Sequence, residues 1–276
     1  MEIGSLLPAH WELTIKNTMV SSLPCPAAMS MPDLYFTKVP FRNAFLRLCN
    51  RFTKGNELSR FLRRCDVNLV LDVGANKGQY GRALVRSGYR GRIVSFEPLP
   101  NAFEKLRMNR WGFRQWQIEP FALGGAYGKA NFNIAANSQS SSLQPMLPSL
   151  VNAAPSTAYV GTCEVQVQKL DDIFERYYVP GDRCYLKIDV QGHEHEVILG
   201  ATKSLRNIMA LQIELSMQPL YSGAQTWRQA IEMLNDYGYR LVKMEPGFGD
   251  QRTGEMLQAD GFFLKEHAIQ SLKSAA

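Results

Sequence analysis

The chain has 276 residues, of which 45% are hydrophobic and 20% are charged. This balance excludes an intrinsically disordered chain and a fibrous repeat, and the length is sufficient to bury a large core. The formal net charge of +6 would suit an anionic partner, but it is equally common in enzymes without one. We therefore expect a soluble, folded protein with one large domain and an extension.

The first 67 residues differ from the rest of the chain. Residues 1–40 contain five prolines and little periodicity, which predicts an irregular N-terminal arm. Residues 41–67 predict a basic amphipathic helix, in which Phe and Leu recur at helical spacing among Arg42, Arg47, Arg51, Lys54, Arg60, Arg63 and Arg64. Either this helix packs its apolar stripe on the domain, or it contacts a membrane surface or an anionic substrate.

The cysteines and the targeting signals bear on the compartment. The five cysteines are scattered without CxxC spacing, so neither a disulfide framework nor a zinc knuckle is indicated. Residues 1–31 lack the pattern of a signal peptide, and no apolar stretch is long enough to cross a bilayer. We expect a protein of the reducing cytoplasm.

From residue 68 onward, short β-rich runs alternate with helical stretches. Strands are predicted at 68–73, 91–98, 115–123, 129–135, 161–168, 184–190, 210–215, 239–245 and 261–266. Helices are predicted at 78–88, at 101–110, after residue 190 through 199, and at 226–238. The alternation indicates βαβ units and predicts a mostly parallel sheet with helices on both faces. Residues 136–160, rich in Ser, Pro and Asn, are predicted to be an insertion or a mobile loop.

A glycine-bearing turn, "LDVGANKGQYG", follows the first predicted strand. Three residues with side chains separate Gly74 from Gly78, so the G-x-G-x-x-G spacing that admits a pyrophosphate is absent. Glu97 ends the second strand at the spacing where an acid accepts hydrogen bonds from a ribose, and Asp72 adds negative charge beside the turn. The ligand implied is a nucleoside with a cationic, amino-acid-like group, a description that S-adenosylmethionine fits.

With these residues placed, the chain resembles the FkbM-type methyltransferases, a branch of the class I, Rossmann-like enzymes that use S-adenosylmethionine. The resemblance covers residues 68–266 and rests on the ordered motifs "VLDVGANKGQYG", "VSFEPLPNAFEKL", "FALGG", "SSSL", "KLDDI", "LKIDVQGHEHEVILGA", "LQIELSMQPLY" and "QADGFFL". It implies an α/β fold with a seven-stranded, mostly parallel sheet that has one antiparallel strand. A C-terminal tail would follow at 267–276.

The resemblance also implies transfer of a methyl group, usually to a hydroxyl of a sugar, a glycan or a secondary metabolite. Carried over by position, the methionine side of the cofactor would be lined by Asp72, Gly74, Asn76 and Gly78. The ribose hydroxyls would bind Glu97, and the adenine would lie near Phe121 and Ala122. The most distinctive motif places at the reaction edge Lys187, Asp189, Gly192 and Glu194, and Glu214 ends the next strand.

Methyl transfer to a hydroxyl is an in-line displacement that is assisted by a general base. Asp189 leaves a buried strand toward the predicted cleft, whereas His193 has the intrinsic pKa better suited to accepting a proton near neutrality. Both are candidate bases, and Lys187 and Glu194 complete the predicted catalytic group. The acceptor is predicted to contact Glu214 and the hydroxyls of Ser140, Ser141 and Ser142. The alternative for the serines is a flexible surface loop with no catalytic task.

The histidines of "QGHEHE" raise the alternative of a metal site. On a helix, His193 and His195 point to different sides and cannot readily share one ion. On an extended turn, a histidine could join Asp189 and Glu214 around a divalent metal. We predict no metal, and a solvated helix surface for His195 and Glu196.

Two further functions stay open at this stage. A nicotinamide-dependent oxidoreductase or epimerase would share the fold but would need a pyrophosphate site, which the glycine spacing disfavours. A non-catalytic module would keep the cofactor fold and use the basic helix to contact membrane or nucleic acid. The leading prediction is an O-methyltransferase with a small-molecule or glycan acceptor and no nucleic-acid partner.

Overall fold

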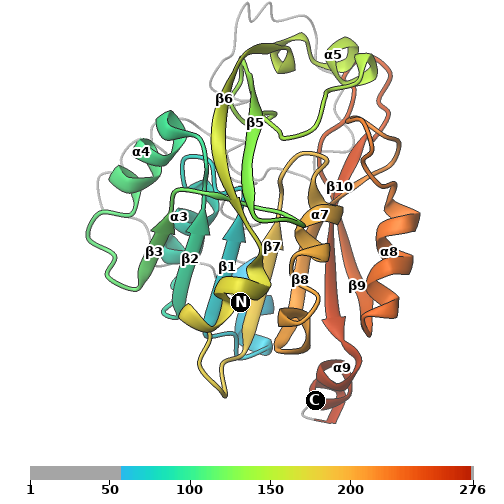
Figure 1. Cartoon of the computed structure of the whole chain (residues 1–276). Coiled ribbons are helices and arrows are strands. Elements are labelled where there is room, and N and C mark those ends of the chain that lie inside the picture. The colour runs from blue at the N-terminus through green and yellow to red at the C-terminus, as the bar shows by residue number, and fades with distance from the viewer. Residues whose placement is uncertain (1–56, 275–276) are drawn as a thin grey trace, which may run out of the picture. The chain divides into compact units, whose positions relative to one another are not determined.

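The computed structural model describes residues 57–274 of the chain (Figure 1). Residues 57–64 are helical, and the predicted arm at 1–40 and the remainder of the predicted basic helix, 41–56, lie outside the described residues. On the described helix, Leu62 is buried, and the ring of Phe61 makes edge contacts with Tyr185 and Phe262 at centroid distances of 6.2 and 5.8 Å. This segment therefore packs on the domain.

The main sheet has seven strands, which are β1 Leu69–Val73, β2 Arg92–Phe96, β3 Trp116–Glu119, β7 Cys184–Ile188, β8 Ile208–Ser216, β9 Tyr239–Pro246 and β10 Gln258–Lys265. Their order is β3-β2-β1-β7-β8-β10-β9. β10 runs antiparallel to both of its neighbours, and the other pairs are parallel (Figure 1). The prediction of a seven-stranded sheet with one antiparallel strand is confirmed.

The helices that cover this sheet are α3 Gln79–Arg86, α4 Pro100–Asn109, α6 Leu170–Ile173, α7 Glu194–Leu199, α8 Trp227–Asp236 and α9 Glu266–Ser274. They lie on both faces. In β1, Leu69 and Leu71 join the hydrophobic cluster that contains residues of α6, α7 and α8, whereas Val70 joins the cluster that contains residues of α3, α4 and α9. Side chains alternate between the faces of a strand, so each face has its own layer of helices. None of the described helices is long and apolar enough to span a membrane.

A second, three-stranded sheet consists of β4 Ala122–Leu123, β5 Gly128–Ala135 and β6 Tyr159–Gln168, in the order β4-β6-β5. The single strand predicted at 115–123 is therefore wrong, since this segment contributes β3 to one sheet and β4 to the other. Pro120 lies between them and has no backbone N–H with which to continue a ladder. The Phe121 ring packs against Phe96, with the ring centroids 5.7 Å apart.

The serine-rich segment at 136–160 is an ordered insertion. It contains the helix α5 (Pro148–Ala153) and the short 3-10 helix η1 (Pro155–Thr157). Its backbone forms isolated bridges to the rest of the domain, which pair Ser142 with Asn133 and Met146 with Tyr221. The long β5 and β6 strands carry this segment above the edge of the main sheet (Figure 1).

The structure also differs from the predicted tail at 267–276, because residues 266–274 form α9. Ala268 and Ile269 of this helix are buried in the cluster that contains Leu62 and Val70. The apolar positions in "EHAIQSL" recur at helical spacing and therefore dock on the sheet.

Candidate active site

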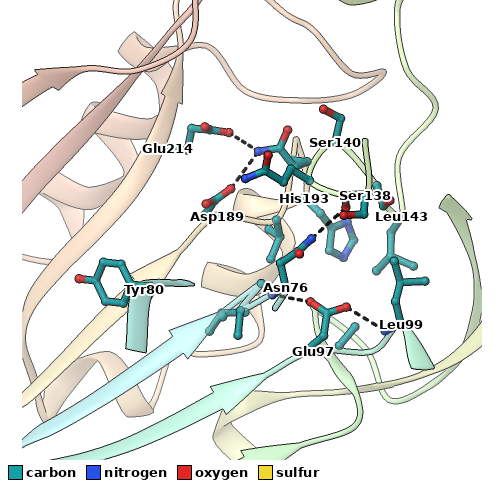
Figure 2. A pocket seen from close by; sticks show the side chains of 18 of the residues that line it. Asn76, Tyr80, Glu97, Leu99, Ser138, Ser140, Leu143, Asp189, His193 and Glu214 are labelled. Atoms are coloured by element: carbon teal, nitrogen blue, oxygen red, sulfur yellow. Dashed lines mark hydrogen bonds between the residues drawn. The ribbon is translucent and has the colours of Figure 1, made fainter. Parts of the chain in front are cut away.

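A cavity of about 720 Å³ opens at the carboxyl ends of β1, β2, β7 and β8 (Figure 2). Parallel α/β sheets bind ligands at this edge, and ligand pockets commonly have volumes of about 300–1,000 Å³. The strand order sets the arrangement, because Glu97 follows β2, Gly74 follows β1, Asp189 follows β7 and Glu214 lies near the end of β8. Neighbouring strands are about 4.8 Å apart, so the strands β2 and β8, which carry the two ends of this row, are roughly 14 Å apart.

The structure brings most of the predicted site residues to this cavity. Its lining includes Gly74, Asn76, Glu97, Ala122, Ser140, Ser141, Lys187, Asp189, His193 and Glu214. The predicted residues that do not line it are Asp72, Gly78, Phe121, Ser142, Gly192 and Glu194. Each residue of the second group is adjacent in the chain to a lining residue.

The turn between β1 and α3 packs closely against the end of β7. Gly74 has a φ of +76°, and a Cβ added there would lie 1.9 Å from the carbonyl oxygen of Asp189. Only glycine combines this backbone conformation with such a close approach. At Gly78, a Cβ would lie 2.6 Å from Leu106 Cδ1, so this glycine lets α3 pack against α4.

The carboxyl group of Glu97 is fixed by the backbone. The N–H of Asn76 donates to Oε2 at 2.7 Å, and the N–H of Leu99 donates to Oε1 at 2.9 Å (Figure 2). Burial raises the pKa of Glu97 to about 7, against the lowering effect of these two hydrogen bonds. Each oxygen still has acceptor capacity for a hydroxyl. The Asn76 side chain donates to the backbone oxygen of Ser138 at 3.0 Å and so ties the turn to the insertion.

Beneath the cavity, Lys187 joins two acids. Its Nζ lies 3.1 Å from Asp72 Oδ1 and 3.4 Å from Asp189 Oδ2, and it donates to the Gly74 carbonyl at 3.2 Å. Asp72 is fully buried, and its Oδ2 accepts a hydrogen bond from Ser95 Oγ at 2.9 Å. Burial alone would lower the pKa of Lys187, but Asp72 and Asp189 hold it well above its ordinary value. Lys187 is therefore a fixed cation that orients Asp189.

The turn after β7 adopts a left-handed backbone at Gln191, where φ is +58°. Glu194 stabilises this turn, because its Oε1 accepts hydrogen bonds from the N–H groups of Val190 and Gly192 at 3.1 and 3.2 Å. The Gln191 amide then donates to Asp189 Oδ1 at 2.9 Å and to Glu214 Oε2 at 2.7 Å. One side chain thus positions two carboxyl groups of the cavity.

The imidazole of His193 points into the wall formed by the insertion. Gln144 Nε2 lies 3.0 Å from its Nδ1, and because an amide nitrogen only donates, Nδ1 accepts and the ring hydrogen is on Nε2. Nε2 in turn faces the backbone at Gly124, where an added Cβ would lie 3.0 Å from it. Burial lowers the pKa of His193, which makes the neutral form dominant near neutrality.

The three predicted serines differ in position: two line the cavity, and one bonds to the turn after β7. Ser140 and Ser141 line the cavity, whereas Ser142 Oγ donates to the backbone oxygen of Gln191 at 2.6 Å. Ser141 Oγ accepts from the Ala135 N–H at 3.0 Å. Ser142 therefore connects the insertion to the turn after β7, and Ser141 connects it to the end of β5.

His195 and Glu196 are only partly exposed, and the His195 Nδ1 atom is buried without a hydrogen-bond partner. The prediction of a solvated helix surface is therefore wrong, because the first turn of α7 faces the "FALGG" loop: an added Cβ at Gly125 would lie 2.5 Å from Glu196 Oε2. Within residues 57–274, no group of three His, Cys, Asp or Glu side chains is arranged to hold a metal ion.

Sequence reasoning missed several polar residues of the cavity, which are Tyr80, Gln191, Gln212, Gln258 and Asp260. All five fall within the quoted motifs, so membership of a motif was the available signal. Four of the five carry amide or phenol groups, which have no strong intrinsic chemistry. Only the fold shows that α3, the turn after β7, β8 and β10 bring the five residues to one cavity.

A family model described as "Methyltransferase FkbM domain" matches residues 72–241. The chain belongs to the FkbM methyltransferase family. The enzyme is thus an S-adenosylmethionine-dependent methyltransferase, and neither the oxidoreductase nor the non-catalytic alternative gains support.

Two relatives are methyltransferases by name. The 2-O-methyltransferase NoeI of Sinorhizobium fredii is 24% identical over 176 residues, which cover 61% of this chain and 72% of NoeI. The hexuronic acid methyltransferase AglP of Haloferax volcanii is 26% identical over 148 residues, 54% of this chain and 56% of AglP. Among solved structures, the O-methyltransferase TomG of Streptomyces achromogenes has a TM-score of 0.45 and 12% identity, with 77% of this chain and 80% of that chain covered.

The residues at the β2 end fit the cofactor. Glu97 presents a backbone-oriented carboxyl group to the cavity, as a ribose diol requires. Beside it, the lining is apolar and suits an adenine ring, with Pro98, Leu99, Ala122 and Leu123. When bound, S-adenosylmethionine supplies a methyl group activated by its sulfonium.

Proposed function

We propose that this methyltransferase modifies a hydroxyl oxygen of a sugar, a glycan or another small molecule. The observation that carries the proposal is the position of Asp189, whose carboxyl group lines the same cavity as Glu97 with polar side chains of β8 and β10 beyond it. NoeI is named an O-methyltransferase, and AglP is named for a sugar acid. The first name supports an oxygen nucleophile, and the second supports a carbohydrate acceptor.

The strand order supports a division of the cavity into two ends. The cofactor would extend from Glu97 at β2, past Gly74 at β1, to Asp189 at β7. The acceptor would occupy the remaining end over β8 and β10, near Glu214 and Asp260. In this arrangement the methyl group and the acceptor hydroxyl meet at the β7 end, which the family motif marks.

Asp189 is the proposed general base. It accepts the proton that the acceptor hydroxyl loses as its oxygen attacks the methyl carbon. Lys187 and the Gln191 amide fix the two oxygens of this carboxyl group, so Lys187 and Glu194 act as positioning residues. His193 is the weaker candidate base because its Nδ1 already accepts from Gln144 and its Nε2 faces Gly124.

Asp189→Asn tests the base. The substitution keeps the shape of the side chain but removes the proton acceptor, so we expect turnover to fall about 100- to 10,000-fold. Binding of S-adenosylhomocysteine, measured by titration calorimetry, should change only a few-fold. Radiolabelled methyl transfer to a panel of glycosides gives the turnover.

His193→Ala is the matched comparison, for which we expect less than about a tenfold loss of turnover because the imidazole only supports the cavity wall. A larger loss in His193→Ala than in Asp189→Asn would transfer the base role to His193. Absence of cofactor binding by the folded wild-type protein would contradict the placement of the cofactor at Glu97.

A further inference from the structure

The acceptor end of the cavity is built from acids and amides. Glu214 and Asp260 are directly opposite each other across the antiparallel pair β8–β10, and both line the cavity. Gln258 Nε2 donates to Glu214 Oε2 at 2.5 Å, and Gln212 Nε2 donates to Asp260 Oδ1 at 3.1 Å. Two carboxyl groups, each bonded to a glutamine amide, therefore face this end of the cavity.

The cationic side chain of the cavity lining is already paired with other groups of the protein. Among the described residues that line the cavity, Lys187 is the only lysine or arginine. Its Nζ is held by Asp72, Asp189 and the Gly74 carbonyl. His193, the remaining titratable nitrogen base of the lining, points to Gln144 and the "FALGG" loop. The described lining thus offers no cation for an anionic group of the acceptor.

The acids at this end are also close enough to affect one another. Burial raises the pKa of Glu214 well above its ordinary value, and Asp189, Glu194 and Asp260 raise it further, while Lys187 opposes them. A carboxyl group in its acid form both donates and accepts hydrogen bonds, as do the nearby glutamine amides. These groups match the hydroxyls of a polyol, whereas another carboxylate would add a further buried negative charge.

We propose that the acceptor presents an uncharged polyhydroxylated unit to this end of the cavity, such as a neutral sugar, and that the matching uronic acid is rejected. The proposal rests on the proposed O-methylation and specifies its substrate class. It separates this enzyme from AglP, whose name specifies a hexuronic acid. The selection comes from Asp189 and Asp260, whose negative charges repel a carboxylate, while Glu214 and the glutamine amides bind hydroxyls.

Matched acceptor pairs test the proposal. The wild-type protein is incubated with radiolabelled S-adenosylmethionine and with methyl glycosides of several hexoses, each paired with its uronic acid counterpart. We expect kcat/KM for the neutral member of a pair to exceed that for the uronic acid on the order of 100-fold or more, since juxtaposed like charges strongly disfavour binding of the charged acceptor.

Equal rates, or faster methylation of the uronic acids, would overturn the proposal and leave sugar O-methylation standing. If no glycoside of either kind is methylated while cofactor still binds, sugar methylation fails and this proposal fails with it.

A charge variant adds a second test. Asp260→Asn removes one negative charge and keeps the shape, so the preference for the neutral member should fall about tenfold or more in this variant. Glu164→Gln is the control, because Glu164 lies on β6, pairs with Lys129 in an exposed salt bridge, and is absent from the cavity lining. An unchanged preference in Asp260→Asn, with the fold intact by circular dichroism, would contradict the role assigned to this acid.

Discussion

At the scale of single residues, Glu97 combines a fixed position with an adjustable charge. Its carboxyl group is held by the N–H groups of Asn76 and Leu99, and burial raises its pKa to about 7. Hydroxyl donors favour the ionised form, so binding of the ribose would lower this pKa. The protonation state of one residue is therefore linked to cofactor affinity.

We expect the affinity for S-adenosylhomocysteine to fall as the pH falls through about 7, approaching tenfold per pH unit well below that value. The sign follows because the free protein binds a proton at Glu97 that the complex excludes. Titration calorimetry between about pH 5.5 and 8.5 measures the effect. Glu97→Gln should bind more weakly and lose most of this pH dependence. An affinity that is constant over the range in the wild-type protein would contradict the linkage.

Not every motif residue proved to contact the cavity. Asp72 and Glu194 are acids of the quoted motifs, yet neither lines the cavity: Asp72 pairs with Lys187, and Glu194 accepts hydrogen bonds from the backbone of the turn. Position in a motif shows that a residue lies near the site. It does not show whether the side chain contacts the ligand or only positions an adjacent residue. Phe121 and Ala122 illustrate the same limit, since adjacent residues of an extended segment point in opposite directions.

At the scale of elements, the β1–α3 turn depends on the end of β7. Gly74→Ala would place a methyl group 1.9 Å from the Asp189 carbonyl oxygen, with a φ of +76° that alanine disfavours. We expect a loss of about 1–3 kcal/mol from the free energy of unfolding and impaired cofactor binding. Urea denaturation and titration calorimetry measure the two effects.

Gly88→Ala is the matched control, because Gly88 has a φ of +88° but nothing within 4 Å of an added Cβ. It should cost about 1–2 kcal/mol of conformational strain and leave cofactor binding unchanged. If both variants bind cofactor normally, the contact between the turn and β7 does not control the site.

At the scale of the whole molecule, the packed unit extends beyond the predicted domain at 68–266. Leu62 precedes this range and Ala268 and Ile269 follow it, and all three are buried in one hydrophobic cluster. The cluster spans the face of the sheet that lies opposite α6, α7 and α8. We propose that residues 57–274 form the folding unit.

Removal of residues 266–276 should lower the free energy of unfolding by about 2–5 kcal/mol, because it uncovers the apolar surface that Ala268 and Ile269 bury. Thermal denaturation followed by circular dichroism tests this expectation. A protein that lacks only residues 275–276 serves as the control. Equal melting temperatures for the two shortened proteins would show that α9 does not contribute to the core.

The sequence by itself determined the alternation of strands and helices, because hydrophobic periodicity is a local property of the chain. The glycine turn and Glu97 indicated the cofactor, and the ordered motifs carried the resemblance to the family. The sequence also identified Glu97 and Asp189, since both lie at the ends of predicted strands. Only the tertiary structure decided that Pro120 divides one predicted strand between two sheets, that Lys187 is held beneath the cavity, and that Gln191 joins Asp189 to Glu214. These features depend on which strands become neighbours and which way each side chain points. Contacts between residues that are distant in the chain, such as Glu214 and Asp260, form only when β8 and β10 pair.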